Sequence, residues 1–297
     1  MDEKNVIIFG AEGMLAKDLL ELFNYESENV HVRGYSKEEC NILDHSDLLN
    51  TIGGTKGSIS HCINLAAYTD IEKAESQEKQ AFELNDYAVK NLCTLCIANE
   101  IHLTHLSTAY VFEGLKNKPY LEQDEAVPLT VYGKSKLAGE GHVRAMGDKG
   151  LVIRTNWLYG KFGKKNLIDS VLNKLELGVD IKIPDDQIGT PTYTMDLSNV
   201  IIQLALSFKS GLFHATNSGE CSLYDFAAQA CKFVDGNLAR LKKSKTSDLN
   251  LKADRPKYSV LSMNRLERTL SEPTRSWQKG LYQYLLETKR VLNVSMG

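Results

Sequence analysis

The sequence predicts an α/β protein built on a doubly wound, mostly parallel β-sheet, with a smaller C-terminal lobe. Three observations support this fold class. Short β-branched, apolar runs alternate with helical patterns through the first part of the chain, which is typical of β-α units in a parallel sheet. A glycine-containing turn joins the first such run to a helix. Beyond about residue 160 the alternation loosens, which indicates a second, smaller unit.

Composition excludes several classes of protein. A formal net charge of -3 over 297 residues gives no electrostatic reason to expect nucleic acid or an acidic membrane as a partner. No apolar run approaches the roughly 20 residues of a membrane span, and the N-terminus lacks the basic and apolar pattern of a signal peptide. We therefore expect a cytoplasmic protein.

The cysteine pattern argues against disulfides and metal. Six cysteines are spread over the whole chain, and Cys93 and Cys96 lie inside a helical pattern rather than on a metal-binding turn. We expect neither a disulfide framework nor a zinc or redox role.

The first β-α unit carries a possible cofactor signal. Residues 5–9 predict a strand, Gly10 and Gly13 lie in the turn, and residues 17–23 predict a helix. Glycine lets the backbone approach a ligand, and the amides at the helix start would face the pyrophosphate of a dinucleotide. The position of this Gly-x-x-Gly-x-x-Ala turn in the chain favours a Rossmann-type, dinucleotide-binding sheet, although an ordinary β-α turn stays open.

The end of the second predicted strand, residues 30–35, bears on which dinucleotide binds. In this fold the carboxyl end of that strand meets the adenosine ribose, where an acidic residue favours NAD. This chain has Arg33, Ser36 and Lys37 there, which suits a 2′-phosphate better. We expect NADP(H), with NAD(H) possible; a solvated charged loop is the alternative.

The following elements continue the β-α alternation. A helix capped near Ser46 precedes a strand at residues 61–64, and small residues follow that strand, as they would beside a ligand. Residues 77–99 predict a long helix, and residues 101–106 and 151–154 predict strands. We expect residues 1–160 to form the NAD(P)-binding domain.

Residues 161–297 are expected to form mainly a substrate-binding lobe, with some segments returning to the sheet. The predicted elements are helices at 166–177 and 194–205, strands at 181–183 and 211–215, a helix beginning at Ser222, a polar loop at 242–248 and a terminal helix at 277–291.

Tyr132 and Lys136 form the candidate catalytic pair. Four residues apart in a predicted helix, they share one face, and a cation beside a phenol favours the phenolate and lowers its pKa. Tyr132 could then exchange a proton with a substrate oxygen. Strand-end hydroxyls at Ser107 and Thr108 could bind the same oxygen. The alternative is an amphipathic helix that happens to carry Tyr and Lys.

Together these segments resemble the extended short-chain dehydrogenase/reductases and, within them, the dTDP-4-dehydrorhamnose reductase family. The resemblance rests on the glycine turn and on motifs spread over nearly the whole chain: Asn-Leu-Ala-Ala-Tyr at 64–68, Ser-Thr-Ala-Tyr-Val-Phe at 107–112, Tyr-Gly-Lys-Ser-Lys at 132–136, Arg-Thr-Asn-Trp-Leu-Tyr-Gly at 154–160, Asp-Gln-Ile-Gly-Thr-Pro-Thr-Tyr at 186–193 and Arg-Pro-Lys-Tyr-Ser at 255–259.

The resemblance implies roles for particular residues. Thr108, Tyr132 and Lys136 take the catalytic positions, and Tyr132 and Lys136 also border the cofactor. Trp157 matches an aromatic residue near the sugar, and Ala109 stands at the usual substrate contact. Further cofactor positions lie at the pyrophosphate (Gly10, Gly13, Met14, Leu15), the adenine (Asn41, Ile42) and the nicotinamide side (Ala66, Ala67, Tyr68).

Three departures from the family pattern limit these expectations. Ala109 replaces the usual aspartate, and Asn41 stands where the family usually has aspartate. Some members bind magnesium through glutamates at a dimer contact, but those positions hold Asp18 and Met195 here. We expect no metal, and either a monomer or a homodimer.

The function that the resemblance implies is reduction of the 4-keto group of a nucleotide-linked 6-deoxyhexose by NAD(P)H, in nucleotide-sugar and polysaccharide biosynthesis. Two alternatives remain. One is a non-catalytic NADP-binding subunit like the regulatory β subunit of methionine adenosyltransferase, which the loss of a carboxylate at Ala109 keeps open. The other is a sugar-nucleotide epimerase, which uses the same Tyr and Lys.

Overall fold

A six-stranded parallel sheet forms the centre of the molecule. The computed structural model describes residues 4–26, 29–53, 59–163 and 166–290. The strand order is β10-β5-β4-β3-β1-β2, and every neighbouring pair is parallel. The strands are β1 (Lys4–Phe9), β2 (Val30–Tyr35), β3 (Ile59–Asn64), β4 (His102–Thr108), β5 (Gly150–Thr155) and β10 (Gly211–His214). This architecture confirms the predicted fold class.

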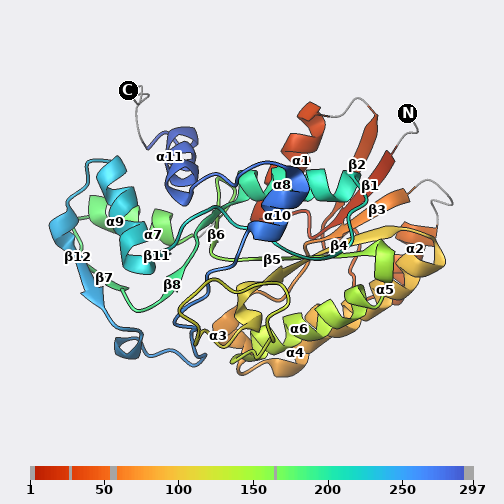
Figure 1. Ribbon diagram of the computed structural model, residues 1–297, viewed down its shortest axis with the longest axis horizontal. Coiled ribbons are helices and arrows are strands. Elements are labelled where there is room, and N and C mark those ends of the chain that lie inside the picture. Colours follow the sequence, from red (N-terminus) through yellow and green to blue (C-terminus); the bar gives the residue numbers. More distant parts are fainter. Residues whose placement is uncertain (1–3, 27–28, 54–58, 164–165, 291–297) are drawn as a thin grey trace.

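Helices cover both faces of the sheet, as Figure 1 shows. One face carries α1 (Met14–Glu26), α8 (Thr194–Leu206) and α10 (Asn264–Leu270), and the other carries α2 (His45–Gly53), α5 (Ala88–Ala98) and α6 (Val131–Arg144). Because side chains alternate along a strand, Ile8 belongs to the core cluster that includes α1 and α8, whereas Ile7 belongs to the cluster that includes α2 and α5. A buried core therefore lies on each side of the sheet.

The strand order places a topological switch point between β1 and β3. From β1 the chain passes through α1 to β2 on one side, and then through α2 to β3 on the other side of β1. Ligands bind in such folds at the carboxyl ends of the strands beside this point. Gly10 follows β1 there with φ +81°, and a Cβ on it would lie 2.8 Å from the backbone nitrogen of Ala66. Only glycine fits both the conformation and the space.

The long helix expected at residues 77–99 is interrupted. It consists of α4 (Glu78–Phe82), a π-helical turn η1 (Glu83–Tyr87) and α5, preceded by the short α3 (Ile71–Ala74). The wider turn carries the buried Asn85, whose amide binds the backbone N–H and C=O of Tyr68 (2.8 and 3.1 Å) and the hydroxyl of Ser135 (3.0 Å). The interruption thus ties this helix to the segment after β3 and to α6.

Two local predictions are wrong. The cap of α2 is Asp44 rather than Ser46, because the Asp44 carboxylate accepts hydrogen bonds from the backbone N–H groups of Ser46 (2.8 Å) and Asp47 (3.3 Å). The segment expected as a polar loop at 242–248 contains strand β12 (Leu241–Ser244), which pairs with β7 (Ile181–Pro184). The first and last residues of β12 are buried, while the two lysines between them are exposed. Exposed lysines are common on edge strands, so the polar composition of this segment was misread as a loop.

The smaller lobe lies at one end of the sheet (Figure 1). It is built from α7 (Leu167–Glu176), α9 (Leu223–Phe233), α11 (Trp277–Glu287) and the β7–β12 pair, with two short sheets that pair β6 (Leu158–Tyr159) with β9 (Thr192–Tyr193) and β8 (Ile188–Gly189) with β11 (Cys221–Ser222). Ser222 caps α9 through a reciprocal pair with Asp225, so the helix predicted at this serine is confirmed. Three segments of the C-terminal part of the chain return to the central sheet: β10, α8 and α10.

Short 3-10 turns complete the chain: η2 (Ala109–Val111), η3 (Gly147–Lys149), η4 (Leu238–Arg240) and η5 (Thr246–Asp248). All six cysteines are buried and unbridged. Of the helices in the described ranges, none has both the length and the apolar character that a membrane span requires. The last residue expected in the terminal helix, Val291, lies outside the described residues.

A buried ion pair fixes α6 on the sheet. The Glu140 carboxylate of α6 accepts two hydrogen bonds from the guanidinium of Arg154 on β5, from Nε at 2.8 Å and from NH2 at 2.6 Å. Ser107 on β4 donates a third at 2.5 Å. The side chains of the pair are 0% and 2% exposed. Because neither charge can reach water, each depends on the other for compensation.

Glu140→Gln should therefore be strongly destabilising, because it leaves the Arg154 charge buried without a counter-charge. We expect a loss of about 3 to 5 kcal/mol in the free energy of unfolding, measured by urea denaturation. The matched control is Glu176→Gln, which breaks an exposed pair with Arg290 and should change the free energy by less than about 1 kcal/mol. Equal effects of the two substitutions would contradict this account of α6.

Candidate active site

The structure brings Thr108 and Tyr132 together. Thr108 is the last residue of β4 and Tyr132 is the second residue of α6, whose first turn is capped by Thr130. The side chains of Thr108 and Tyr132 are hydrogen-bonded, and the Thr108 hydroxyl also accepts the backbone N–H of Tyr110 at 3.2 Å. Two hydroxyls thus meet at the carboxyl edge of the sheet, where one oxygen atom of a ligand could contact both.

The protonation of Tyr132 differs from the expectation. Burial raises the pKa of Tyr132 to about 12, the hydrogen bond with Thr108 acts in the opposite direction, and the neighbouring phenol of Tyr110 raises it further. The two rings meet edge to face with centroids 5.9 Å apart. The prediction that Lys136 lowers this pKa is wrong for the structure described, because burial dominates the shift and Lys136 is not among the groups that act on the phenol. At neutral pH Tyr132 therefore carries its proton.

Lys136 is directed into the interior between α6 and β4. It is 2% exposed, and its Nζ lies 3.2 Å from Nε2 of the buried His105. Burial lowers the pKa of Lys136 to about 8, with the Glu140 carboxylate opposing this shift. The sequence interpretation missed His105 as a site residue. The available signal was a histidine inside the predicted strand at 101–106, a position between Leu103 and Leu106 that the sheet would bury.

Six of the expected cofactor residues line one cavity. A space of about 210 Å³ at the switch point is bounded by Gly10, Lys37, Asn41, Ile42, Ala66 and Ala67, together with Cys40, Leu43 and Leu84. The cavity combines a glycine that allows close backbone approach, small residues after β3 and one cation. These features fit the adenosine part of a dinucleotide, and Ala66 and Ala67, which the resemblance placed on the nicotinamide side, border the same cavity.

Other expected cofactor residues lie differently. Arg33 is exposed, and its guanidinium stacks over the ring of Tyr35 at 4.7 Å. Ser36 and Glu39 bind each other's backbone N–H groups at 3.2 and 2.8 Å. Neither Arg33 nor Ser36 lines the cavity, which leaves Lys37 as the cation that does.

The start of α1 offers its backbone rather than its side chains. The Gly13 amide bonds the Gly10 carbonyl at 3.0 Å, and the Leu15 side chain is buried in the core. The sulfur of Met14 packs beside Gly163, 2.7 Å from where a Cβ on that glycine would stand. The main-chain amides at this helix start could meet a pyrophosphate, as at other helix N-termini.

Tyr68 and Ala109 have contrasting surroundings. Tyr68 packs in the same small apolar cluster as Tyr132, and its hydroxyl donates to the side chain of Gln77 at 2.5 Å. Ala109, by contrast, is 0% exposed and belongs to the core cluster on the α1 side of the sheet. The expected substrate contact at Ala109 is therefore wrong, because this side chain presents no surface to a ligand.

Trp157 lies at the junction of sheet and lobe in a strained conformation. Its φ is +41°, a region that residues other than glycine rarely adopt. Its carbonyl accepts the Thr192 amide at 3.1 Å, and its indole packs on Gly189, where a Cβ would lie 2.8 Å from two ring carbons. Such outliers concentrate at ligand sites, which fits the expected role beside the sugar.

No group of three or more His, Cys, Asp or Glu side chains that could hold a metal ion occurs within the described ranges. Asp18, at one position where the resemblance implies a magnesium ligand, is buried and accepts the hydroxyl of Thr194. Burial raises the pKa of this carboxyl to about 6.

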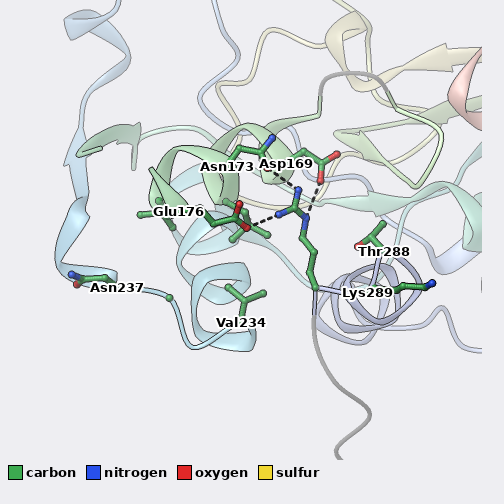
Figure 2. A pocket seen from close by; sticks show the side chains of 11 residues that line it. Asp169, Asn173, Glu176, Val234, Asn237, Thr288 and Lys289 are labelled. Atoms are coloured by element: carbon green, nitrogen blue, oxygen red, sulfur yellow. Dashed lines mark hydrogen bonds and ion pairs between the residues drawn. The ribbon is translucent and has the colours of Figure 1, made fainter. Parts of the chain in front are cut away.

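A larger cavity of about 730 Å³ lies in the lobe between α7, α9 and the end of α11 (Figure 2). The Arg290 guanidinium there already binds Glu176 (2.9 Å) and Asn173 (2.8 Å) and lies 3.7 Å from Asp169, as the dashed lines in Figure 2 mark. The cavity contains none of the expected catalytic residues and its arginine is fully engaged, so size alone does not identify the active site.

Comparison with known proteins gives one family across the whole fold. A family model described as RmlD substrate binding domain matches residues 4–290. The chain is 33% identical over 282 residues to the spore coat polysaccharide biosynthesis protein SpsK of Bacillus subtilis, covering 95% of this chain and 97% of that protein. It is 32% identical over 278 residues to a dTDP-4-keto-6-deoxy-D-glucose reductase of Streptomyces niveus, covering 93% and 95%.

Solved structures agree with these relatives. The dTDP-4-dehydrorhamnose reductase of Bacillus anthracis, solved in complex with NADP, superposes with a TM-score of 0.90 at 30% identity, covering 96% of this chain and 99% of that one.

If Lys37 meets a 2′-phosphate, Lys37→Glu should weaken the binding of NADPH and leave that of NADH nearly unchanged, because only NADPH carries the additional anion. A charge contact at a partly exposed site corresponds to roughly 5- to 30-fold in the dissociation constant. Cofactor fluorescence titrations measure both constants, and Lys182→Glu, an exposed lysine of the lobe, is the control. Equal weakening of both cofactors would exclude a 2′-phosphate contact.

Proposed function

Since the chain belongs to the RmlD substrate binding domain family, we propose that it is an NADPH-dependent reductase acting on the 4-keto group of a nucleotide-linked 6-deoxyhexose. The observation that carries the proposal is the hydrogen-bonded pair of Thr108 and Tyr132 at the carboxyl edge of the sheet, the edge at which the cavity at the switch point also opens from the ends of β1 and β3. A reductase needs a proton donor and a dinucleotide site; in this proposal the hydroxyl pair is the donor and the cavity takes the adenosine end of the dinucleotide. Two of the named relatives are reductases by name, one of dTDP-4-keto-6-deoxy-D-glucose and one of dTDP-4-dehydrorhamnose.

The chain's own groups account for the proton chemistry. When bound, NADPH supplies the hydride that adds to C4. As negative charge develops on the C4 oxygen, Tyr132 donates its phenolic proton and the Thr108 hydroxyl donates a hydrogen bond. The raised pKa of Tyr132 keeps the phenol protonated before the reaction, which is the form that a general acid requires. Lys136 holds the nicotinamide ribose in this proposal.

Binding roles follow from the same geometry. The cavity at Gly10, Asn41 and Ala66 would take the adenosine, with Lys37 beside its 2′-phosphate. Trp157, held at the sheet–lobe junction, would pack against the sugar. We further propose that the protein acts in the cytoplasm, because both reactants are multiply charged and must already be present in the compartment where the enzyme works. We also propose that it acts as a monomer or homodimer.

The direct test is NADPH consumption with a panel of nucleotide-linked 4-keto-6-deoxyhexoses. We expect oxidation of NADPH only when the ketosugar is present, with a product reduced at C4. Absence of turnover with the whole panel, combined with cofactor binding and co-purification with a larger enzyme, would point to a regulatory subunit instead. A cofactor retained through purification, with interconversion of C4 epimers, would point to an epimerase.

Tyr132→Phe removes the phenolic proton while keeping the ring that packs beside Tyr68 and Tyr110. Because general acids typically contribute 10²- to 10⁴-fold, kcat should fall by roughly this factor, while the dissociation constant of NADPH should change little. Steady-state kinetics and cofactor titration measure the two effects. A variant that keeps more than about a third of wild-type kcat would have lost only about threefold, far less than a general acid contributes, and would remove Tyr132 from the acid role.

A further inference from the structure

A buried chain of hydrogen bonds connects Lys136 with the edge of the cofactor cavity. The backbone N–H of Ala66 donates to Oδ1 of Asn64 at 3.1 Å. The Nδ2 of Asn64 lies 3.2 Å from Nδ1 of His105, and Nε2 of His105 lies 3.2 Å from Nζ of Lys136. Asn64 and His105 are 0% exposed, so no bulk water competes for these contacts. Each side chain therefore depends on its neighbours in the chain for hydrogen bonding.

The direction of this chain is fixed at one end. A backbone N–H can only donate, so the Asn64 atom facing Ala66 must be the oxygen, and the amide NH₂ must face His105. Nδ1 of His105 is then an acceptor. A neutral imidazole with an accepting Nδ1 carries its proton on Nε2, which faces Lys136. The Nε2–H can donate to Lys136 only if Nζ has a free lone pair, that is, as the neutral amine.

The charges around this chain agree with that direction. Burial and the neighbouring Lys136 keep the pKa of His105 well below its ordinary value, so the ring stays neutral. Burial also lowers the pKa of Lys136 to about 8, so its amine form is accessible near neutral pH. The other ionisable groups of α6 are Tyr132, Lys134, Glu140, His142 and Arg144. The elements packed against α6 carry Glu72 and Lys73 on α3 with Glu75 just after it, Glu78 and Lys79 on α4, Glu83, Asp86 and Tyr87 on η1, Lys90, Cys93 and Cys96 on α5, His102 on β4, Tyr110 on η2 and Arg154 on β5.

None of these groups substitutes for His105. Glu140 is held by Arg154 and Ser107, Asp86 by His142, and Glu75 accepts the backbone N–H of Val131. In the described part of the chain, His105 is the side chain recorded within hydrogen-bonding distance of Nζ.

We propose that Asn64 and His105 are positioning residues that set the proton occupancy of Lys136. The neutral amine of Lys136 can accept a hydrogen bond from Nε2–H of His105. The ammonium form cannot accept that bond and must turn its protons toward the active site. The link runs through the N–H of Ala66, a residue that lines the cofactor cavity, so the backbone of that cavity orients the chain. The inference rests on the proposed function for the role of Lys136 but not for the direction of the hydrogen bonds, which is measurable in the free protein.

Asn64→Asp reverses the chain with almost no change in shape. One carboxylate oxygen can still accept the Ala66 N–H, and the other must accept a hydrogen bond from His105 in place of donating one. The imidazole proton then moves to Nδ1, and Nε2 becomes an acceptor for the Lys136 ammonium. Both the reversed chain and the added negative charge stabilise the ammonium, so the sign of the effect is fixed: the pKa of Lys136 rises.

Nitrogen NMR of histidine-labelled protein reports the tautomer directly, with the His105 signals assigned by their loss in His105→Leu. We expect the proton on Nε2 in the wild type and on Nδ1 in Asn64→Asp. NMR titration of lysine-labelled protein should show the midpoint of Lys136 rising by at least about one pH unit, a tenfold gain in proton affinity. The control Asn237→Asp, an exposed cap in the lobe, should leave both observables unchanged.

Two results would overturn the proposal. One is a wild-type His105 that carries its proton on Nδ1, a measurement that requires no variant to fold. The other is an equal rise of the Lys136 midpoint on adding Asn64→Asp to the His105→Leu protein, because the carboxylate would then act through space without the imidazole.

A separate readout tests the proposed function. If Lys136 holds the nicotinamide ribose, the pH above which NADPH binding weakens should rise in Asn64→Asp together with the NMR midpoint. A rise of the midpoint with no change in NADPH binding would contradict the placement of Lys136 at the cofactor, while the direction of the hydrogen-bonded chain would stand.

Discussion

The position of α6 is the constraint on which the active site depends. Three groups buried between this helix and the sheet compensate one another: the Glu140 carboxylate, the Arg154 guanidinium and the Ser107 hydroxyl. Isolated charges cannot remain ionised in such surroundings, so any shift of α6 that separated the pair would carry a large electrostatic penalty. Tyr132 and Lys136 project from the same helix, so the ion pair that holds α6 on the sheet also holds these two residues in place. The ion pair therefore acts on the reaction without touching a reactant.

Close backbone contacts reinforce this constraint. A Cβ on Gly133 would lie 2.2 Å from the carbonyl oxygen of Tyr110, and one on Gly139 would lie 2.2 Å from that of Asn85. Both distances are far below van der Waals contact, so α6 approaches η2 and η1 as closely as a helix can. Gly10 makes the corresponding approach to Ala66 at the switch point. The same residue type thus sets the spacing at the catalytic helix and at the cofactor cavity.

The sequence predicted the parallel sheet, the cap at Ser222 and six residues of one cavity, because these features follow from periodicity, local capping chemistry and topology. It did not predict burial. Four-residue spacing placed Tyr132 and Lys136 on one helix face, but the sign of the Tyr132 shift depends on desolvation, which only the packed structure shows. The contact between Lys136 and His105 and the core position of Ala109 were hidden for the same reason.

The raised pKa of Tyr132 also bears on the direction in which the site runs. With a pKa of about 12, roughly one molecule in 10⁵ carries the phenolate at pH 7. Oxidation of an alcohol requires that phenolate as base, whereas reduction of a ketone uses the abundant phenol. Near neutrality the resting protonation state of Tyr132 is therefore the one that reduction uses. The capacity of the site for the reverse reaction grows about tenfold with each pH unit, until other groups titrate.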